Sequence, residues 1–254
     1  MEESKIQVTD KSNSRYLLLD FIRGIAVLNM IAYHTLWDLV FIYNINIPWY
    51  KGNIGFVWQQ LICQSFILLS GFCVNLSRKG FKRGAVVFFC GLLISLVTYL
   101  FMRENIIVFG IMTFIGSAMI ITEALKPVFK RIHSALGFAI SLSLFVITYN
   151  LDRGYLGFKQ FNIALPDFLY RNLFTTYLGF KEEGFFSTDY FPLFPWIFLF
   201  LTGYFIFGLT GGRERINKNN FLGLKPVNFL GRNALIIYLV HQPLIYLILN
   251  LICK

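Results

Sequence analysis

The feature that most restricts the fold is a series of long apolar runs. A helix needs about 20 mostly apolar residues to cross a bilayer, and seven runs have roughly that length. They cover residues 17–43, 54–77, 84–102, 106–125, 133–150, 190–211 and 230–252. Backbone groups inside a bilayer must be hydrogen-bonded within the chain, so each run is expected to be a helix. The sequence therefore predicts an all-α polytopic membrane protein with about seven transmembrane helices in a single domain, residues 1–254.

The composition supports this class. Of the 254 residues, 56% are hydrophobic and only 14% are charged, whereas soluble domains carry about 25% charged residues. The net charge of +10 does not indicate a nucleic-acid partner, because the Lys and Arg residues lie between the apolar runs, where they act as topology signals. The four cysteines lack the spacing of a metal site or a disulfide framework, so no metal is expected. The apolar composition makes the lipid bilayer the expected partner.

The basic residues also predict an orientation. They are concentrated in alternate connections, namely 78–83, 126–131 and 212–232, whereas 44–53 and 103–105 hold few. Lys and Arg are enriched in cytoplasmic loops. The N-terminus, with a tail over residues 1–15, is therefore expected in the cytoplasm.

The segment 151–189 is the one long connection, and the same rule makes it an external loop. Its acidic and basic residues nearly balance. Residues 165–180 within it predict a short helix that lies on the membrane or folds over a cavity, with a simple tether as an equal alternative. Asp189 and Tyr190 are placed at the external mouth of the sixth run, and Trp196 is expected to anchor that run at the interface.

The first apolar run carries four ionisable residues, Asp20, Arg23, His34 and Asp38. Each such residue costs at least about 2.5 kcal/mol in a bilayer, so intramembrane examples are functional candidates. Arg23 and His34 lie about three helical turns apart and share a face, and Asp38 follows His34 by one turn, within reach of its imidazole. A carboxylate would fix the imidazole tautomer and make it a better general base. Simple alternatives are an Asp20–Arg23 ion pair at the helix end and a helix-to-helix hydrogen bond from His34.

The last run carries a second polar set. Arg232 is expected at its cytoplasmic end, and Tyr238 and His241 share a face further along. The Gln242-Pro243 pair predicts a kink, since proline frees a backbone carbonyl that must be satisfied by protein or by a water-filled cavity. Together with polar residues of the second run, these groups predict a polar cavity within the bundle.

Several short motifs resemble those of membrane acyltransferases. Arg23 and His34, with ten residues between them, resemble the Arg-x10-His signature of the acyltransferase-3 proteins, and FILLSGF (66–72) resembles their second-span motif. A wider set is similar to bacterial proteins related to the catalytic domain of heparan-alpha-glucosaminide N-acetyltransferase. This set comprises DFIRG (20–24), HTLWDL (34–39), FGIMTFIG (109–116), DYFPLFPW (189–196) and LGRNALIIYLVHQP (230–243), and it extends from about residue 15 to 250.

The resemblance implies an enzyme of the bacterial plasma membrane that moves an acetyl group from cytoplasmic acetyl-CoA to an amine or hydroxyl of an extracytoplasmic sugar or glycan. The catalytic residues would be His34, as general base, and Asp38. CoA carries several phosphate charges, which suit cytoplasmic cations. The residues expected at the donor are Arg23, Arg78, Lys82, Arg83, Arg232 and Asn233, and those expected at the acceptor are Asp189, Tyr190, Tyr238, His241 and Gln242.

Some alternatives stay open at this point. An acetyl-His intermediate would serve in place of direct transfer, and a homo-oligomer is neither indicated nor excluded. The alternative from another class is a non-catalytic, proton-coupled transporter of small molecules in which His34, Asp38 and His241 relay protons. Binding of acetyl-CoA would separate the two functions.

Overall fold

The computed structural model describes residues 16–158, 161–212 and 223–253. In this part of the chain, six helices are long and apolar enough to span a bilayer. They are α1 (Leu17–Phe41), α3 (Asn53–Val74), α4 (Gly80–Phe101), α5 (Ile111–Phe129), α6 (Ser134–Thr148, with the turn that follows it) and α11 (Ala234–Ile252). The protein is thus a mostly helical integral membrane protein. The predicted tail 1–15 and the basic residues Arg213, Arg215 and Lys218 lie outside the described residues.

A further apolar helix, α8 (Leu193–Leu209), has 17 residues and is shorter than the other spans. It coincides with the sixth predicted run. Each of the seven predicted runs therefore contains a helix, but six of these helices in the described chain reach spanning length.

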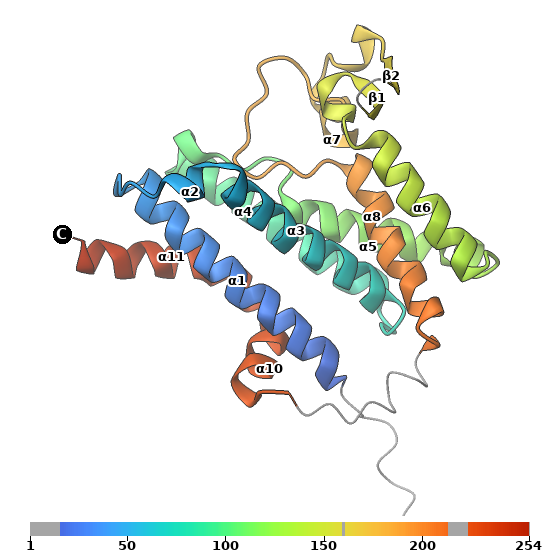
Figure 1. Ribbon diagram of the computed structural model, residues 1–254, viewed down its shortest axis with the longest axis horizontal. Coiled ribbons are helices and arrows are strands. Elements are labelled where there is room, and N and C mark those ends of the chain that lie inside the picture. Colours follow the sequence, from blue (N-terminus) through green and yellow to red (C-terminus); the bar gives the residue numbers. More distant parts are fainter. Residues whose placement is uncertain (1–15, 159–160, 213–222, 254) are drawn as a thin grey trace, which may run out of the picture. The chain divides into compact units, whose positions relative to one another are not determined.

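The first compact unit comprises residues up to Tyr43 and those from Thr210 onward. Within it, α1 packs against both α10 (Lys225–Arg232) and α11 (Figure 1). The last predicted run began at residue 230, but the structure divides it at Asn233, where α10 ends and α11 begins. The chain thus returns to α1 with two separate helices, and α11 continues through Pro243.

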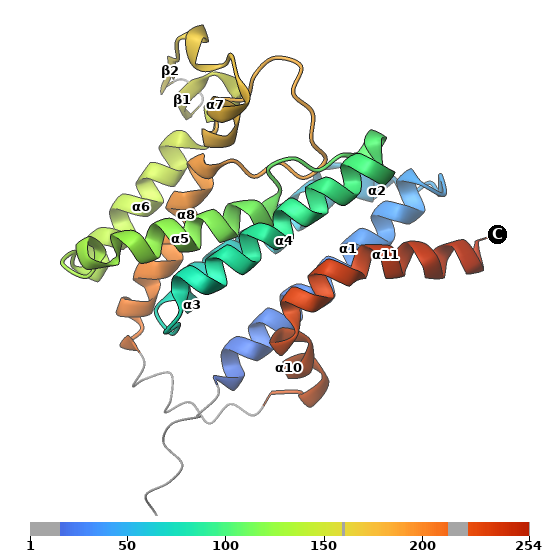
Figure 2. The ribbon, with the colours of Figure 1, turned by 180° about the vertical axis from the view of Figure 1, so that it is seen from behind.

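The second unit comprises residues 44–209. It contains the short helix α2 (Pro48–Lys51) and the helices α3 to α6 and α8 (Figure 2). In it, α4 packs on α5, and α8 packs on both α3 and α6. Small residues allow these close contacts, because a Cβ at Gly71 of α3 would collide with the carbonyl oxygen of Phe200 in α8.

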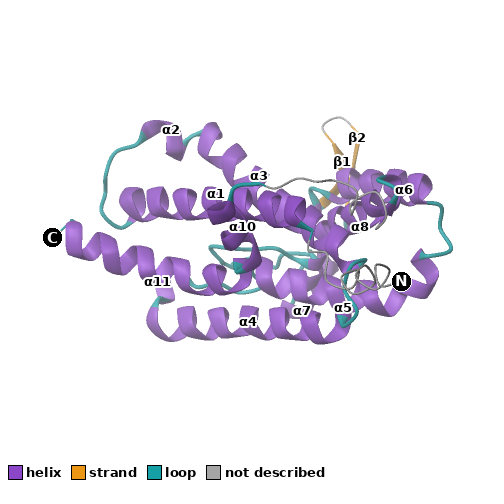
Figure 3. Cartoon of the chain, turned by 90° about the horizontal axis from the view of Figure 1, so that it is seen from below, coloured by secondary structure: helices purple, strands orange, loops and turns teal. Residues whose placement is uncertain are grey.

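A segment of short elements in the second unit follows α6. It consists of a 3₁₀ turn (Leu151–Arg153), strands β1 (Tyr155–Phe158) and β2 (Phe161–Ala164), a second 3₁₀ turn (Asp167–Leu169) and helix α7 (Leu173–Leu178). The two strands form an antiparallel hairpin, visible in Figure 3. A third 3₁₀ turn, Arg103–Asn105, connects α4 to α5. The predicted short helix within 165–180 is α7, whereas the hairpin was not predicted from the sequence.

Trp196 occupies a different place from the expected one. Its side chain is buried, and its ring packs against Phe145, Tyr149 and Phe191 at centroid distances of 5.6, 6.2 and 4.9 Å. An interface anchor needs a ring exposed at the membrane surface. Trp196 instead fills the contact between α6 and α8.

Candidate active site

The motifs singled out in the sequence meet in pairs. In the first unit, DFIRG at the start of α1 lies against the LGRN segment at the end of α10, and HTLWDL lies against the His-Gln pair of α11. In the second unit, FGIMTFIG and DYFPLFPW meet through backbone and side-chain hydrogen bonds. Sequence motifs far apart in the chain are therefore partners in space.

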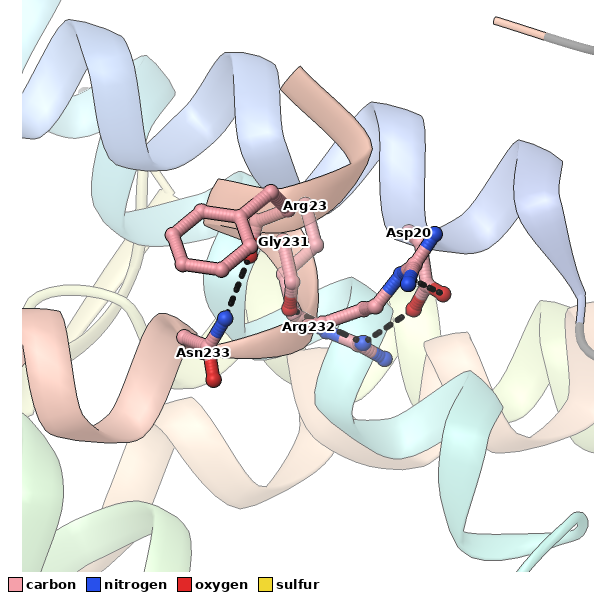
Figure 4. A network of polar contacts seen from close by, with 6 residues as sticks. Asp20, Arg23, Gly231, Arg232 and Asn233 are labelled. Atoms are coloured by element: carbon pink, nitrogen blue, oxygen red, sulfur yellow. Dashed lines mark hydrogen bonds and ion pairs between the residues drawn. The ribbon is translucent and has the colours of Figure 1, made fainter. Parts of the chain in front are cut away.

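The first pair is an ion network around Asp20 (Figure 4). One terminal nitrogen of Arg23 lies 3.2 Å from Asp20 Oδ1 and 3.4 Å from the carbonyl oxygen of Gly231. The Nε atom of Arg232 lies 3.8 Å from Asp20 Oδ2. Asn233 donates to the carbonyl oxygen of Phe229 at 2.9 Å and so closes the end of α10. Two guanidinium groups thus approach one carboxylate within the described residues.

Two glycines allow this approach. A Cβ on Gly231 would overlap the carbonyl oxygen of Asp20, and one on Gly24 would overlap that of Val227. The backbones of α1 and α10 therefore touch directly, which only residues without a side chain permit. Neither glycine was predicted from the sequence as a site residue, although each lies inside a motif that resembles the family.

The second pair joins two histidines. The rings of His34 in α1 and His241 in α11 lie 4.8 Å apart between centroids, in an edge-to-face arrangement. One turn further along α1, the Oδ1 atom of Asp38 accepts a hydrogen bond of 2.6 Å from Nε2 of Gln242. Asp38 is fully buried, and His241 is 7% exposed. His34, the predicted general base, thus lies beside His241, and Asp38 binds Gln242. Both partners on α11 were expected at the acceptor.

The tautomer of His241 follows from its hydrogen bond. Its Nδ1 lies 2.7 Å from the carbonyl oxygen of Tyr238. A carbonyl only accepts, so Nδ1 carries the proton and the neutral ring presents Nε2 as an acceptor. Tyr238 is thus held near His241 through its backbone, with the two rings 5.5 Å apart between centroids.

Three buried acceptor atoms in this pair lack a hydrogen-bond partner among the described residues. They are Asp38 Oδ2, His241 Nε2 and Gln242 Oε1. Buried polar atoms are nearly always paired, so such a group needs an explanation. Since all three atoms are acceptors, they suit a ligand that presents N–H or O–H donors.

The structure alters the expected relation between Asp38 and His34. Their one-turn spacing suggested that the carboxylate would bind the imidazole, but within the described residues the hydrogen bond of Asp38 goes to Gln242. The amide of Gln242 occupies the carboxylate because α11 packs directly on this face of α1. Asp38 therefore orients Gln242 rather than the ring of His34.

In the second unit, Asp189 and Tyr190 serve local structure. Asp189 Oδ2 accepts a hydrogen bond of 3.0 Å from the backbone N–H of Ile111, at the start of α5. Tyr190 donates from its hydroxyl to the carbonyl oxygen of Thr176 in α7 at 2.7 Å. Burial raises the pKa of Asp189 to about 6, against the opposing effect of the hydrogen bond from Ile111. Both side chains hold loops in place, so their expected contact with an acceptor stays a prediction.

The remaining cations expected at the donor are exposed. Arg78 precedes α4, and Lys82 and Arg83 lie in its first turn. The structure leaves all three available to solvent and does not test their role.

The chain matches one protein family over most of its length. The family model described as heparan-alpha-glucosaminide N-acetyltransferase, catalytic, matches residues 15–243. No curated protein and no solved structure matches the chain. The matched range contains both polar pairs of the first unit and the paired motifs of the second. The protein therefore belongs to the family of the heparan-alpha-glucosaminide N-acetyltransferase catalytic domain, and at the level of that family it is a membrane-embedded transferase.

Proposed function

We propose that this protein transfers an acetyl group from acetyl-CoA to an amine or hydroxyl of a sugar or glycan. The observation that carries this proposal is the set of buried acceptor atoms on Asp38, His241 and Gln242, in a chain of this family. An amine or hydroxyl presents the donors that these atoms lack. A site built to hydrogen-bond such donors discriminates strongly against analogues without them.

In the proposed reaction, His34 takes the proton of the acceptor as its nitrogen or oxygen attacks the acetyl carbonyl. The C–S bond of the donor then breaks, and the proton passes from His34 to the leaving thiolate. His241 lies beside His34 and binds the acceptor through Nε2, while Asp38 and Gln242 hold each other in place. An acetyl-His34 intermediate remains the alternative route, with the same net balance.

Arg23 and Arg232 are proposed to bind the phosphates of the donor. Both guanidinium groups lie against Asp20 in the described part of the chain, at the end of α1 that is expected in the cytoplasm. Guanidinium groups suit phosphate because their planar donors match its oxygens. Asn233 lies beside this cluster, and Arg78, Lys82 and Arg83 stay a prediction from the sequence.

The proposed orientation places the N-terminus in the cytoplasm and the loop 151–189 outside, as the basic residues predict. The Asp20 cluster and the His34 pair lie at different depths along α1, which suits a donor held at one face and an acceptor at the other. In sealed vesicles of known orientation, acetyl-CoA should act only from the cytoplasmic side and the acceptor only from the other.

A proton-coupled transporter is the second candidate. The observation that favours it is the direct contact of His34 and His241 near Asp38, which would also suit a proton relay. Such a carrier has no need of acetyl-CoA. Binding of acetyl-CoA to the purified protein therefore separates the two candidates.

The test is a calorimetric titration with acetyl-CoA and a turnover assay with amino sugars. Arg23→Ala should weaken acetyl-CoA binding, whereas the exposed Arg103, in the turn between α4 and α5, provides the matched control as Arg103→Ala. His34→Ala should reduce turnover by about 10²–10⁴-fold, the usual cost of losing a general base. Absence of acetyl-CoA binding by the folded wild type would refute the proposed function, and normal turnover in His34→Ala would refute the role of His34.

A further inference from the structure

The hairpin of β1 and β2 has one strongly apolar face. In its register Leu156 pairs with Ile163 and Phe158 with Phe161, so these four side chains lie on the same side of the hairpin. The exposed fractions are 52% for Phe158, 88% for Phe161 and 69% for Ile163. A contiguous apolar face on a soluble surface usually marks a binding site, and an exposed apolar strand pair invites aggregation.

The hairpin is fixed to the end of a membrane-spanning helix. Asn150, two residues after the end of α6, donates from its side chain to the carbonyl oxygen of Gly157 in β1 at 3.0 Å. Tyr170 donates to the carbonyl oxygen of Leu151 at 2.7 Å and ties the chain after the hairpin to the same point. The base of the hairpin is therefore held at the end of α6.

The lipid-facing surface of α6 continues to this point. Val146 and Ile147, in the last turn of α6, are 48% and 47% exposed. Trp196, the expected interface anchor of this part of the chain, is buried instead. Phe158 and Phe161, on the hairpin whose first strand packs on α6, are among the exposed aromatic side chains of this segment.

We propose that the apolar face of the hairpin, formed by Leu156, Phe158, Phe161 and Ile163, inserts into the interfacial layer of the bilayer. Apolar faces of peripheral segments enter this layer to a depth of about 5–10 Å. A strand of four residues is about 13 Å long. If the hairpin lies parallel to the membrane surface, all four apolar side chains can enter this layer together. This membrane contact fixes the loop that precedes α7 and requires no acetyl-transfer activity.

Neighbouring residues of β2 provide a matched test. Phe161 points to the apolar face, whereas Asn162 pairs with Gly157 and points to the opposite face. Single cysteines at these positions, Phe161→Cys and Asn162→Cys, are introduced into a chain whose four native cysteines are replaced by alanine. Each is labelled with bimane and reconstituted in nanodiscs with and without lipids that carry a nitroxide on the acyl chain near the headgroup.

The expected result is a blue-shifted emission at position 161 and a ratio of lipid quenching at 161 to that at 162 well above one. Water-like emission at both positions would overturn the proposal. So would a blue shift at 161 without quenching by lipid, since the face would then be covered by protein. If Phe161→Cys does not fold, Phe158→Cys on the same face is compared with Ala164→Cys on the opposite face. The readout is independent of acetyl-CoA, so its failure leaves the proposed function standing.

Discussion

The hydrogen bond between Asp38 and Gln242 should be measurable as a coupling in stability between α1 and α11. It is 2.6 Å long, and Asp38 is fully buried. Gln242→Leu removes the partner that the structure gives to this carboxylate, so the free energy of unfolding should fall. Asp38→Leu leaves the amide of Gln242 without this acceptor and should lower it as well. The double variant loses both polar groups together and should recover part of the stability.

The magnitude depends on which class of hydrogen bond this is. Neutral hydrogen bonds between membrane helices contribute on average about 0.6 kcal/mol, whereas hydrogen bonds to charged groups contribute about 1.5–3 kcal/mol. Complete burial disfavours a charged carboxylate, but it also makes an unpartnered carboxyl or amide group costly, by about 1–3 kcal/mol. The coupling energy should therefore be about 1–3 kcal/mol, above the average for membrane helices.

The measurement is a double-mutant cycle from reversible unfolding in one detergent mixture. Thr35 provides the control, because its hydroxyl bonds to Ile31 within α1 at 2.8 Å and makes no bond to α11 among the described contacts. Thr35→Val and Gln242→Leu should therefore be additive. A coupling between Asp38→Leu and Gln242→Leu of less than about 0.5 kcal/mol, the usual error of additivity, would refute the assignment.

Two further predictions concern packing and pH. Gly231→Ala should lower the free energy of unfolding by about 1–3 kcal/mol or more, because its Cβ would overlap the Asp20 carbonyl oxygen. Gly52→Ala is the control and should have little effect, because its Cβ meets only ordinary contacts at 3.7 Å. Equal melting temperatures for the two variants would contradict the close approach of α1 and α10. Folding raises the pKa of Asp189 from 3.8 to about 6, so the folded protein favours the protonated carboxyl group. The protonated group contributes its full stabilisation below the unfolded pKa, and this contribution is lost as the pH rises through about 6. Asp189→Asn keeps an acceptor for Ile111 and should gain melting temperature relative to the wild type between about pH 4 and pH 7, and a constant difference over that range would count against the raised pKa.

The sequence predicted the helices well because each apolar run is long and uniform. The first run, 17–43, became α1 over Leu17–Phe41, and the third, 84–102, became α4 over Gly80–Phe101. The break at Asn233 was not predicted, because the residues on both sides are compatible with one continuous helix. The hairpin was missed as well, since its four-residue strands are too short for a clear alternation.

The polar residues were found, but their partners were not. Helical spacing relates residues of one helix, so it paired Asp38 with His34, whereas the actual hydrogen bond comes from Gln242 on another helix. Likewise, Asp189 was placed at a substrate mouth by its position before an apolar run, and in the structure it accepts a hydrogen bond at the start of α5. Such contacts depend on how helices pack, which periodicity in one segment does not reveal.

The pairing of α1 with the last two helices has a consequence for synthesis in the membrane. Arg23 and Gly231 are 208 positions apart, and Asp38 and Gln242 are 204. At about 5–20 residues per second, the ribosome needs on the order of 10–40 s to make the intervening chain. For that time the first helix must be held with Arg23 and Asp38 lacking their α10 and α11 contacts. The nascent chain is therefore expected to depend on the insertion machinery, or on temporary polar contacts, until its last helix arrives.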